Sequence, residues 1–328
     1  MPITDYQSAT SLSTAQQCEQ LYYWKYDRLL EEVTKGGGLR TGLVMHVGQE
    51  SYMRGHNLRA AINAMEDDAA EHGFDDEPLF NIKNEAYIRG YYNKWEAADS
   101  HLFKEKRYSV LGVEEEFEFV FDGIRFVGKM DAVMCDNETG EIILWEHKNV
   151  SSREASDPTS LYWRLLPMNT QMAIYAQYLI EKYEAPVSVM YDVVITSPKS
   201  KPGQISKGIR RRKDETTEEF AQRKLDNTET LPQFASRLTD TYLNDAEGRF
   251  IRQLVPLMND AVETRMGELS SLSRRLDEMD IPTRNPGRCS SYGGCAFVNA
   301  CLGLEDPECS SKFRVRERAH TGPSKQGA

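Results

Sequence analysis

The stretch that decides the fold runs from Ile124 to Val150 and reads IRFVGKMDAVMCDNETGEIILWEHKNV. Two apolar runs with strand character flank a turn at residues 137–140. The first run carries Asp131. The second ends on Glu146 and Lys148, whose side chains share one face because they are two residues apart. Buried charge is costly unless it is paired or binds a metal ion. The stretch therefore predicts two neighbouring strands that carry a divalent-metal site with a lysine beside it.

Helical and strand patterns alternate on both sides of this stretch. We expect helices over residues 10–30, from about 39 across His46, within 60–103, over 169–182, from about 215, and over 244–276. We expect strands over residues 113–121, 124–134, 141–150 and 186–196. Asp122-Gly123 between the first two strands is a strong hairpin signal. This order predicts an α/β fold.

Composition excludes several classes of protein. The chain has 328 residues, of which 40% are hydrophobic, and this is typical of a packed globular protein. Its net charge of -11 argues against a protein that coats nucleic acid through overall charge. No apolar run approaches the ~20 residues of a membrane span, and no secretion signal is evident. We therefore expect a cytoplasmic protein without a membrane partner.

The strand pair resembles the PD-(D/E)XK nuclease superfamily, and its RecB-like branch most closely. In that branch the first acid follows a glycine on a strand, as in Gly128 to Asp131, and the second motif matches Glu146-His147-Lys148. Further matches come in the family's order: a helix that delivers His46, the acid Glu114 one strand earlier, and the pair Gln171 and Tyr175 on one helix face.

The resemblance implies a metal-dependent deoxyribonuclease, more often an exonuclease, with a restriction-endonuclease-like core: a central mixed β-sheet flanked by helices. It implies Mg²⁺ or Mn²⁺ held by His46, Asp131, Glu146 and the backbone carbonyl of His147. Lys148 would orient the attacking water and offset charge on the phosphate. Gln171 and Tyr175 would contact the scissile phosphate or the strand beside it. The implied catalytic residues are Asp131, Glu146, Lys148, Gln171 and Tyr175.

Cysteines crowd near the end of the chain. Such crowding in a chain without an export signal favours metal or cluster ligation over disulfides. The CRISPR-associated RecB-like exonucleases and the AddAB-type nuclease subunits combine one early cysteine with three late ones. The resemblance implies that a [4Fe–4S] cluster is bound by Cys18, Cys289, Cys295 and Cys301. The gap between Cys289 and Cys295 is five residues, where the family commonly shows two.

The cysteines also allow a second arrangement. A local structural zinc site would use Cys309 in place of Cys18, together with Cys289, Cys295 and Cys301. Cys135 lies on or just past the Asp131 strand and is expected to be an ordinary core or loop thiol.

The resemblance predicts one nuclease domain over residues 1–318. It divides into a helical region at 1–104 with His46, a catalytic core at 105–196, a basic insertion and helices at 197–280, and a cysteine module at 281–318. A disordered tail at 319–328 follows. The basic segment Lys199–Lys213 would contact a nucleic-acid backbone or form a solvated hairpin or loop. The aromatic run at 22–24 would stack on bases or, preferably, pack in the core.

These features point to DNA as the substrate, either single-stranded or an end-bearing duplex. The chain has no G-x-x-x-x-G-K-[ST] run, so a helicase or recombination partner would be a separate protein. The compact size of the chain and its single nuclease domain suit a recombination or repair protein of a phage or mobile element. The alternative is a non-catalytic nucleic-acid-binding or assembly protein that retains the nuclease fold. The intact acids and Lys148 favour the enzyme.

Overall fold

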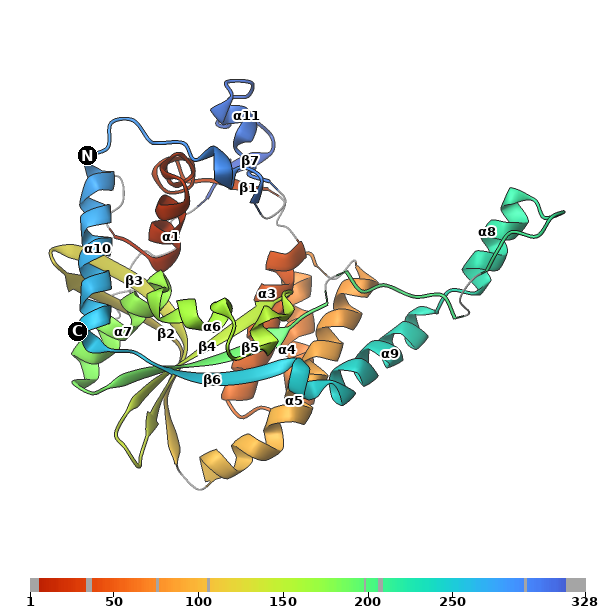
Figure 1. The fold of residues 1–328 in the computed structure, drawn as a ribbon, viewed down its shortest axis with the longest axis horizontal. Helices are drawn as coiled ribbons and strands as arrows, with labels where there is room; N and C mark the ends of the chain where they lie inside the picture. Colours follow the sequence, from red (N-terminus) through yellow and green to blue (C-terminus); the bar gives the residue numbers. More distant parts are fainter. Residues whose placement is uncertain are drawn as a thin grey trace.

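The computed structural model describes residues 6–316, apart from 34–36, 75–76, 105–106, 198, 206–208 and 292–293. The expected tail at 319–328 lies outside the described residues. A sheet with strand order β2-β3-β4-β5-β6 occupies the centre of the fold, and helices cover both of its faces (Figure 1). The predicted α/β class with a mixed central sheet flanked by helices is confirmed.

The central sheet begins with an antiparallel meander and continues with a parallel pair. Its strands are β2 (Tyr108–Phe121), β3 (Ile124–Asp136), β4 (Ile142–Val150), β5 (Val187–Ile195) and β6 (Phe250–Pro256). β4 pairs with β5 in parallel, and the remaining neighbours are antiparallel. The expected hairpin is confirmed at Asp122 and Gly123, whose φ angles of 53° and 77° are those of a tight two-residue turn.

Alternation along β4 separates the two hydrophobic cores. Ile142 and Leu144 pack into one core, and Ile143 and Trp145 pack into the other. The first core lies beneath α1 (Ala9–Gln17), α6 (Leu161–Leu165), α7 (Thr170–Tyr183) and α10 (Asn259–Asp277). The second lies beneath α3 (Gly37–Met53), α4 (Leu58–Glu71), α5 (Pro78–Lys104) and α9 (Leu231–Asn244). Short 3-10 turns connect these elements at η2 (Arg153–Ser156), η3 (Leu166–Met168) and η4 (Ala246–Gly248).

The predicted helix over residues 10–30 is wrong as a single element, because the segment is divided into shorter helices. α1 ends at Gln17, and α2 (Glu19–Tyr22) and the π-helix η1 (Tyr23–Asp27) follow. Cys18 between them is extended, with φ of -168°. The break is stabilised by the carboxyl-terminal module, because Gln20 N–H donates to the carbonyl of Thr283 at 3.1 Å. A contact across the whole chain thus overrides the local helical pattern.

The predicted helix over 244–276 is wrong in its first part and confirmed in its second. α9 ends at Asn244, β6 occupies Phe250–Pro256, and α10 begins only at Asn259. Phe250 and Val255 are buried against the sheet's two cores, and that packing stabilises an edge strand. Pro256 closes the strand, where a missing backbone donor is tolerated.

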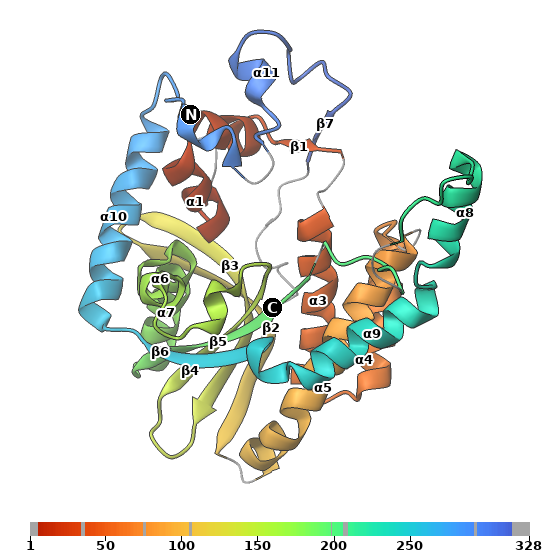
Figure 2. The ribbon, with the colours of Figure 1, turned by 45° about the vertical axis from the view of Figure 1, so that its right-hand side comes forward.

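A second, two-stranded sheet joins the two ends of the chain. β1 (Leu30–Glu32) pairs antiparallel with β7 (Phe313–Val315). Figure 2 shows this carboxyl-terminal module, which includes η5 (Pro286–Arg288) and α11 (Val298–Cys301), beside the first helices of the chain. The Phe297 ring stacks on Trp24 with 6.2 Å between centroids, and Tyr22 is 2% exposed. The preferred interpretation of this aromatic run as core packing is therefore confirmed for both residues.

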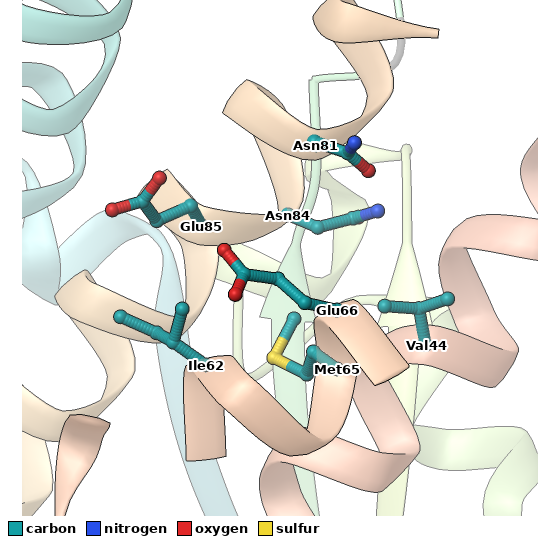
Figure 3. A pocket seen from close by; sticks show the side chains of 7 residues that line it. All are labelled: Val44, Ile62, Met65, Glu66, Asn81, Asn84 and Glu85. Carbon is teal, nitrogen blue, oxygen red and sulfur yellow. The ribbon is translucent and has the colours of Figure 1, made fainter. Parts of the chain in front are cut away.

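A small, partly open cavity lies within the helical layer. It measures about 30 Å³ between α3, α4 and α5, and its lining includes Val44, Met65 and Asn84 (Figure 3). Asn84 is buried, and neither polar atom of its side chain has a hydrogen-bond partner among the described residues. The volume and this polar group suit about two water molecules.

No helix in the described part of the chain is both long enough and apolar enough to cross a membrane.

Candidate active site

Asp131 lies where β3 separates from β4. The register of the two strands ends at Ala132 opposite Trp145. One residue beyond, Asp131 Oδ2 accepts a hydrogen bond of 2.7 Å from the backbone N–H of His147. The carboxylate of β3 is thereby held at a fixed position against β4. The turn at residues 137–140 thus places Asp131 beside the Glu146–Lys148 segment, as expected from the sequence.

The glycine that precedes this acid has a steric reason. A Cβ atom at Gly128 would lie 2.7 Å from the Phe117 ring and 2.9 Å from the Tyr175 ring. The two rings pack edge to face with 5.1 Å between centroids. Tyr175 is buried, and burial raises the pKa of its hydroxyl. The structure therefore places Tyr175 against the strand that carries Asp131, where it packs.

Three possible metal ligands meet in the middle of β3, where β3 separates from β4. Ligand atoms of His46, Glu114 and Asp131 all lie within 4.8 Å of one another. His46 comes from α3, and its Nδ1 is 3.6 Å from Asp131 Oδ1. Glu114 has a φ of 55° within β2, a left-handed conformation that costs a residue with a side chain about 1–3 kcal/mol. Its carboxylate also forms an ion pair with Lys129.

Glu146 lies outside this group and contacts two hydrogen-bond donors of the site. Its Oε1 accepts hydrogen bonds from Lys148 Nζ and, at 2.8 Å, from Gln171 Nε2. Lys148 Nζ also donates to Gln171 Oε1 at 3.0 Å. Asn169 fixes Gln171 by capping the first turn of α7, at 2.8 Å. The three predicted residues Glu146, Lys148 and Gln171 are thus brought together.

One oxygen of Glu146 is left over. The residue is 1% exposed, and its Oε2 has no hydrogen-bond partner within the described part of the chain. A buried carboxylate oxygen without a donor is costly. The donor set around it, which consists of carboxylates and one imidazole, fits a divalent cation that prefers oxygen ligands.

Burial and neighbouring charges shift the pKa values of the site's ionisable groups. Burial raises the pKa of Glu146, against the opposing charge of Lys148. Burial also acts to raise the pKa of Asp131, but the nearby His46 side chain and, to a smaller extent, the hydrogen bond from the His147 backbone outweigh it and lower the pKa to about 2. Burial lowers the pKa of Lys148, but the charge of Glu146 outweighs it and leaves the pKa above its usual value. Lys148 is therefore an ammonium ion.

A comparison with protein families agrees with this geometry. The profile of the PD-(D/E)XK nuclease superfamily matches residues 6–301, a span that includes every residue of the candidate site. The chain belongs to the PD-(D/E)XK nuclease superfamily. The crystal structure of a candidate exonuclease from Eubacterium rectale is similar with a TM-score of 0.46 and 11% identity, over 92% of this nuclease and 89% of that chain. A comparison with curated proteins found no match.

The nuclease also contains a buried polar network that the sequence reading missed. The His147 ring is 2% exposed, and its Nδ1 lies 3.2 Å from both Asp192 Oδ2 and Gln49 Nε2. Asp192 is fully buried on β5 and also accepts hydrogen bonds from Tyr91 and Trp145. The signal in the sequence was a single acid within the apolar run 187–195.

Arg252 of β6 completes this network. Its Nε lies 3.2 Å from Asp192 Oδ1, and its Nη1 lies 2.7 Å from both carboxylate oxygens of Asp99. Burial acts to raise the pKa of Asp192, but Arg252 and His147 outweigh it and hold the pKa well below its usual range. The network lies on the face of β4 that is opposite to Glu146 and Lys148. Its contacts hold the His147 side chain in place.

The cysteines that the resemblance grouped are brought together in the nuclease. Cys18, Cys289 and Cys295 line a cavity of about 200 Å³ between the first helices and the carboxyl-terminal module. Burial, with smaller contributions from neighbouring thiols that include Cys18, raises the pKa values of Cys295 and Cys301. The five-residue gap closes on itself, because Cys295 N–H donates to the Cys289 carbonyl at 2.8 Å.

The remaining two cysteines have other surroundings. Cys309 is exposed, and its thiol pKa is raised by a hydrogen bond and the charge of Asp306. Cys135 lies on β3, packed against the first core, as expected of an ordinary thiol.

Proposed function

We propose that this nuclease hydrolyses phosphodiester bonds in DNA with Mg²⁺ or Mn²⁺, as an exonuclease in recombination, repair or phage DNA processing. The observation that carries the proposal is the Glu146 carboxylate. One oxygen is shared between Lys148 and Gln171, and the other is buried without a partner among the described residues. A buried carboxylate oxygen without a donor is costly, and a bound divalent ion would satisfy it.

The residues around Glu146 suit a divalent ion. Asp131, Glu146 and His46 would hold it with the carbonyl of His147, and Glu114 is a further ligand within reach. The imidazole suits Mn²⁺ better than Mg²⁺. When bound, the ion would neutralise charge on the phosphate and lower the pKa of a water molecule.

The protein's own groups then have separate tasks. Because Lys148 is protonated, it would act by charge and hydrogen bonding on the phosphate and the attacking water, and not as a base. Gln171 would hold the ammonium group in place through its 3.0 Å hydrogen bond. Water adds to phosphorus, the bond to the leaving oxygen breaks, and that oxygen takes up a proton. Charge stabilisation by a single donor of this kind is worth about 10²–10³ in rate.

The test is digestion of end-labelled single-stranded and duplex DNA with Mg²⁺, with Mn²⁺ and with a chelator. We expect metal-dependent release of nucleotides from the ends by the wild type, and at least about 100-fold slower release by Lys148→Ala. The control is Lys182→Ala, on α7 but paired with Glu115. If wild type and Lys148→Ala degrade DNA equally, or if neither does, the non-catalytic alternative replaces the enzyme.

We also propose that Cys18, Cys289, Cys295 and Cys301 bind a [4Fe–4S] cluster. In a tetrahedral zinc site with Zn–S bonds of about 2.3 Å, the sulfur atoms lie about 3.8 Å apart. Among the cysteines, all of which are described, no three sulfur atoms lie within 4.8 Å of one another. The resemblance to the nucleases that bind an iron–sulfur cluster favours a cluster over a single zinc ion. Such a group would tie the two ends of the chain together.

A further inference from the structure

The segment that follows β5 has an unusual charge for this protein. Residues Lys199 to Lys213 carry seven lysines and arginines and no acid, whereas the whole chain has 51 acidic and 40 basic residues. The described part of this segment, residues 199–205 and 209–213, is named the basic arm below. A cationic stretch in an acidic protein marks a place where a polyanion can bind without being repelled by the remainder of the surface.

The basic arm follows the carboxyl end of β5, the strand that lies beside the active-site strand β4. β4 and β5 run in parallel, with Lys148 opposite Val193. Thr196 N–H donates to the Val150 carbonyl at 2.7 Å, directly before the arm. Lys199 is the sixth residue after Val193, so the Cα atoms of these two residues are at most about 22 Å apart at 3.6 Å per residue. That length corresponds to about six nucleotides of one strand.

The backbone of the arm is ordered by its own contacts. Ile205 N–H donates to the Asn227 carbonyl at 2.7 Å, and Glu229 N–H donates to the Gly203 carbonyl at 2.8 Å. Arg237 of α9 pairs with Glu229 and also donates to the carbonyl of Lys201 at 3.3 Å. The arm is therefore tied to α9, which packs on α5, and is more than a solvated loop.

The charged side chains of the arm are available. Lys199, Lys201, Arg210 and Lys213 are exposed, and no side-chain partner occurs for them among the residues that the structure describes. Farther along, α8 (Thr217–Asp226) buries none of its residues and projects away from the sheet (Figures 1 and 2). The basic arm and α8 therefore form an ordered extension with exposed cations, which suits the binding of an anionic ligand.

We infer that the basic arm is a nucleic-acid clamp, which binds the phosphate backbone of the DNA strand beyond the scissile bond. This inference rests on the proposed function for the identity of the polyanion. An acidic protein surface is the other macromolecule that such an arm could bind. DNA is favoured because the arm follows β5 at the end of the strand pair that carries Lys148, and a DNA strand about six nucleotides long would span the distance between Lys148 and Lys199.

The experiment compares Lys199→Ala/Lys201→Ala with the control Arg59→Ala/Lys312→Ala, which removes two exposed cations from α4 and from the carboxyl-terminal module. Binding of a fluorescent 30-nucleotide single strand is measured by anisotropy in a chelator, between 50 and 300 mM NaCl. We expect the arm variant to lose about 1.4 from the slope of log K against log salt, and about 10- to 30-fold in affinity at 0.1 M. The control should match the wild type.

Hydrolysis of bis(p-nitrophenyl) phosphate, a diester too small to reach the arm, separates the two proposals. We expect the arm variant to hydrolyse this compound as fast as the wild type, and to show a raised KM for long DNA alone. Unchanged DNA affinity and salt slope in the arm variant would overturn the clamp and leave an acidic protein as the partner. If the wild type hydrolyses neither substrate but the arm variant loses DNA affinity, the clamp stands and the proposed activity fails.

Discussion

Gln171 Oε1 accepts a hydrogen bond of 3.0 Å from Lys148 Nζ, while Gln171 Nε2 donates at 2.8 Å to the carboxylate that pairs with the same lysine. A single amide from α7 therefore sets the position of both charged groups on β4. Gln171→Ala should leave the fold intact and lower the rate of DNA hydrolysis about 10- to 100-fold. Steady-state kinetics with Mn²⁺ measure this.

The matched control lies two turns along the same helix. Gln177 donates to Glu181 at 2.8 Å, away from the active site, so Gln177→Ala should retain full activity. Equal rates for the two variants would remove Gln171 from the catalytic machinery.

Metal binding should depend on pH through His46. Burial lowers the pKa of His46, but the hydrogen bond and charge of Asp131 outweigh it and raise the pKa above 6.5. A protonated imidazole cannot bind a metal, so Mn²⁺ affinity should rise with pH until His46 has lost its proton. Calorimetric titration with Mn²⁺ between pH 5.5 and 8.5 measures the slope.

His46→Ala should bind Mn²⁺ more weakly and with a flatter pH dependence, whereas His72→Ala, directly after α4, should behave as the wild type. An unchanged slope in His46→Ala would show that another group titrates.

Asp192 should stabilise the fold at neutral pH and lose that effect in acid. Its pKa in the folded protein lies well below 3.8, so its contribution is present above about pH 4 and falls as the pH drops below that value. Asp192→Asn removes the partner of the buried Arg252 and should cost about 3 kcal/mol at pH 7. Urea unfolding at pH 7 and pH 3.5 measures both values.

The difference between wild type and Asp192→Asn should shrink at pH 3.5. Asp226→Asn, an exposed residue on α8, should change the stability by less than about 0.5 kcal/mol. A difference that grew in acid would contradict the assigned charge of Asp192.

Gly128 should not tolerate a methyl group. The added Cβ would lie 2.7 Å from Phe117 and 2.9 Å from Tyr175, and such overpacking costs about 1–3 kcal/mol. Gly42 is the control because it lies within α3 with nothing within 4 Å of a Cβ. Gly42→Ala should stabilise by about 0.5–1 kcal/mol. Thermal unfolding of both variants measures these changes. A Gly128→Ala variant as stable as the wild type would contradict the steric argument.

The cysteines can be separated by single substitutions. After anaerobic purification, the wild type should be brown with about four iron atoms per chain. Cys18→Ser should lose iron and colour, and Cys309→Ser and Cys135→Ser should keep both. A colourless wild type with one zinc ion, retained in Cys18→Ser and lost in Cys309→Ser, would establish the local zinc site instead.

Much of the site could be predicted because its parts are local in sequence. Alternation along residues 124–150 gives both the strands and the face that each acid occupies, and the i, i+4 spacing places Gln171 over β4. Glu114 was harder to single out within its run of three glutamates, since only the left-handed turn of β2 decides which one reaches His46. That turn depends on the partner strand.

The missed features depend on contacts between distant segments. The strand β6 carries Arg252 and Gln253 in its centre, which weakens its apolar pattern, and Arg252 becomes favourable only beside Asp192 and Asp99. Cys18 breaks a helical pattern because residues near 283 bind the next turn. No local propensity encodes either arrangement.

The pairing of Leu30 with Val315 has a consequence for the order in which the protein forms. The first helices leave the ribosome early, but the strand that completes their sheet is synthesised after nearly all the remaining chain. Contacts so distant in sequence form slowly. During synthesis the central sheet can therefore assemble while Trp24 still lacks its stacking partner Phe297. Closure of this two-stranded sheet becomes a late step of folding.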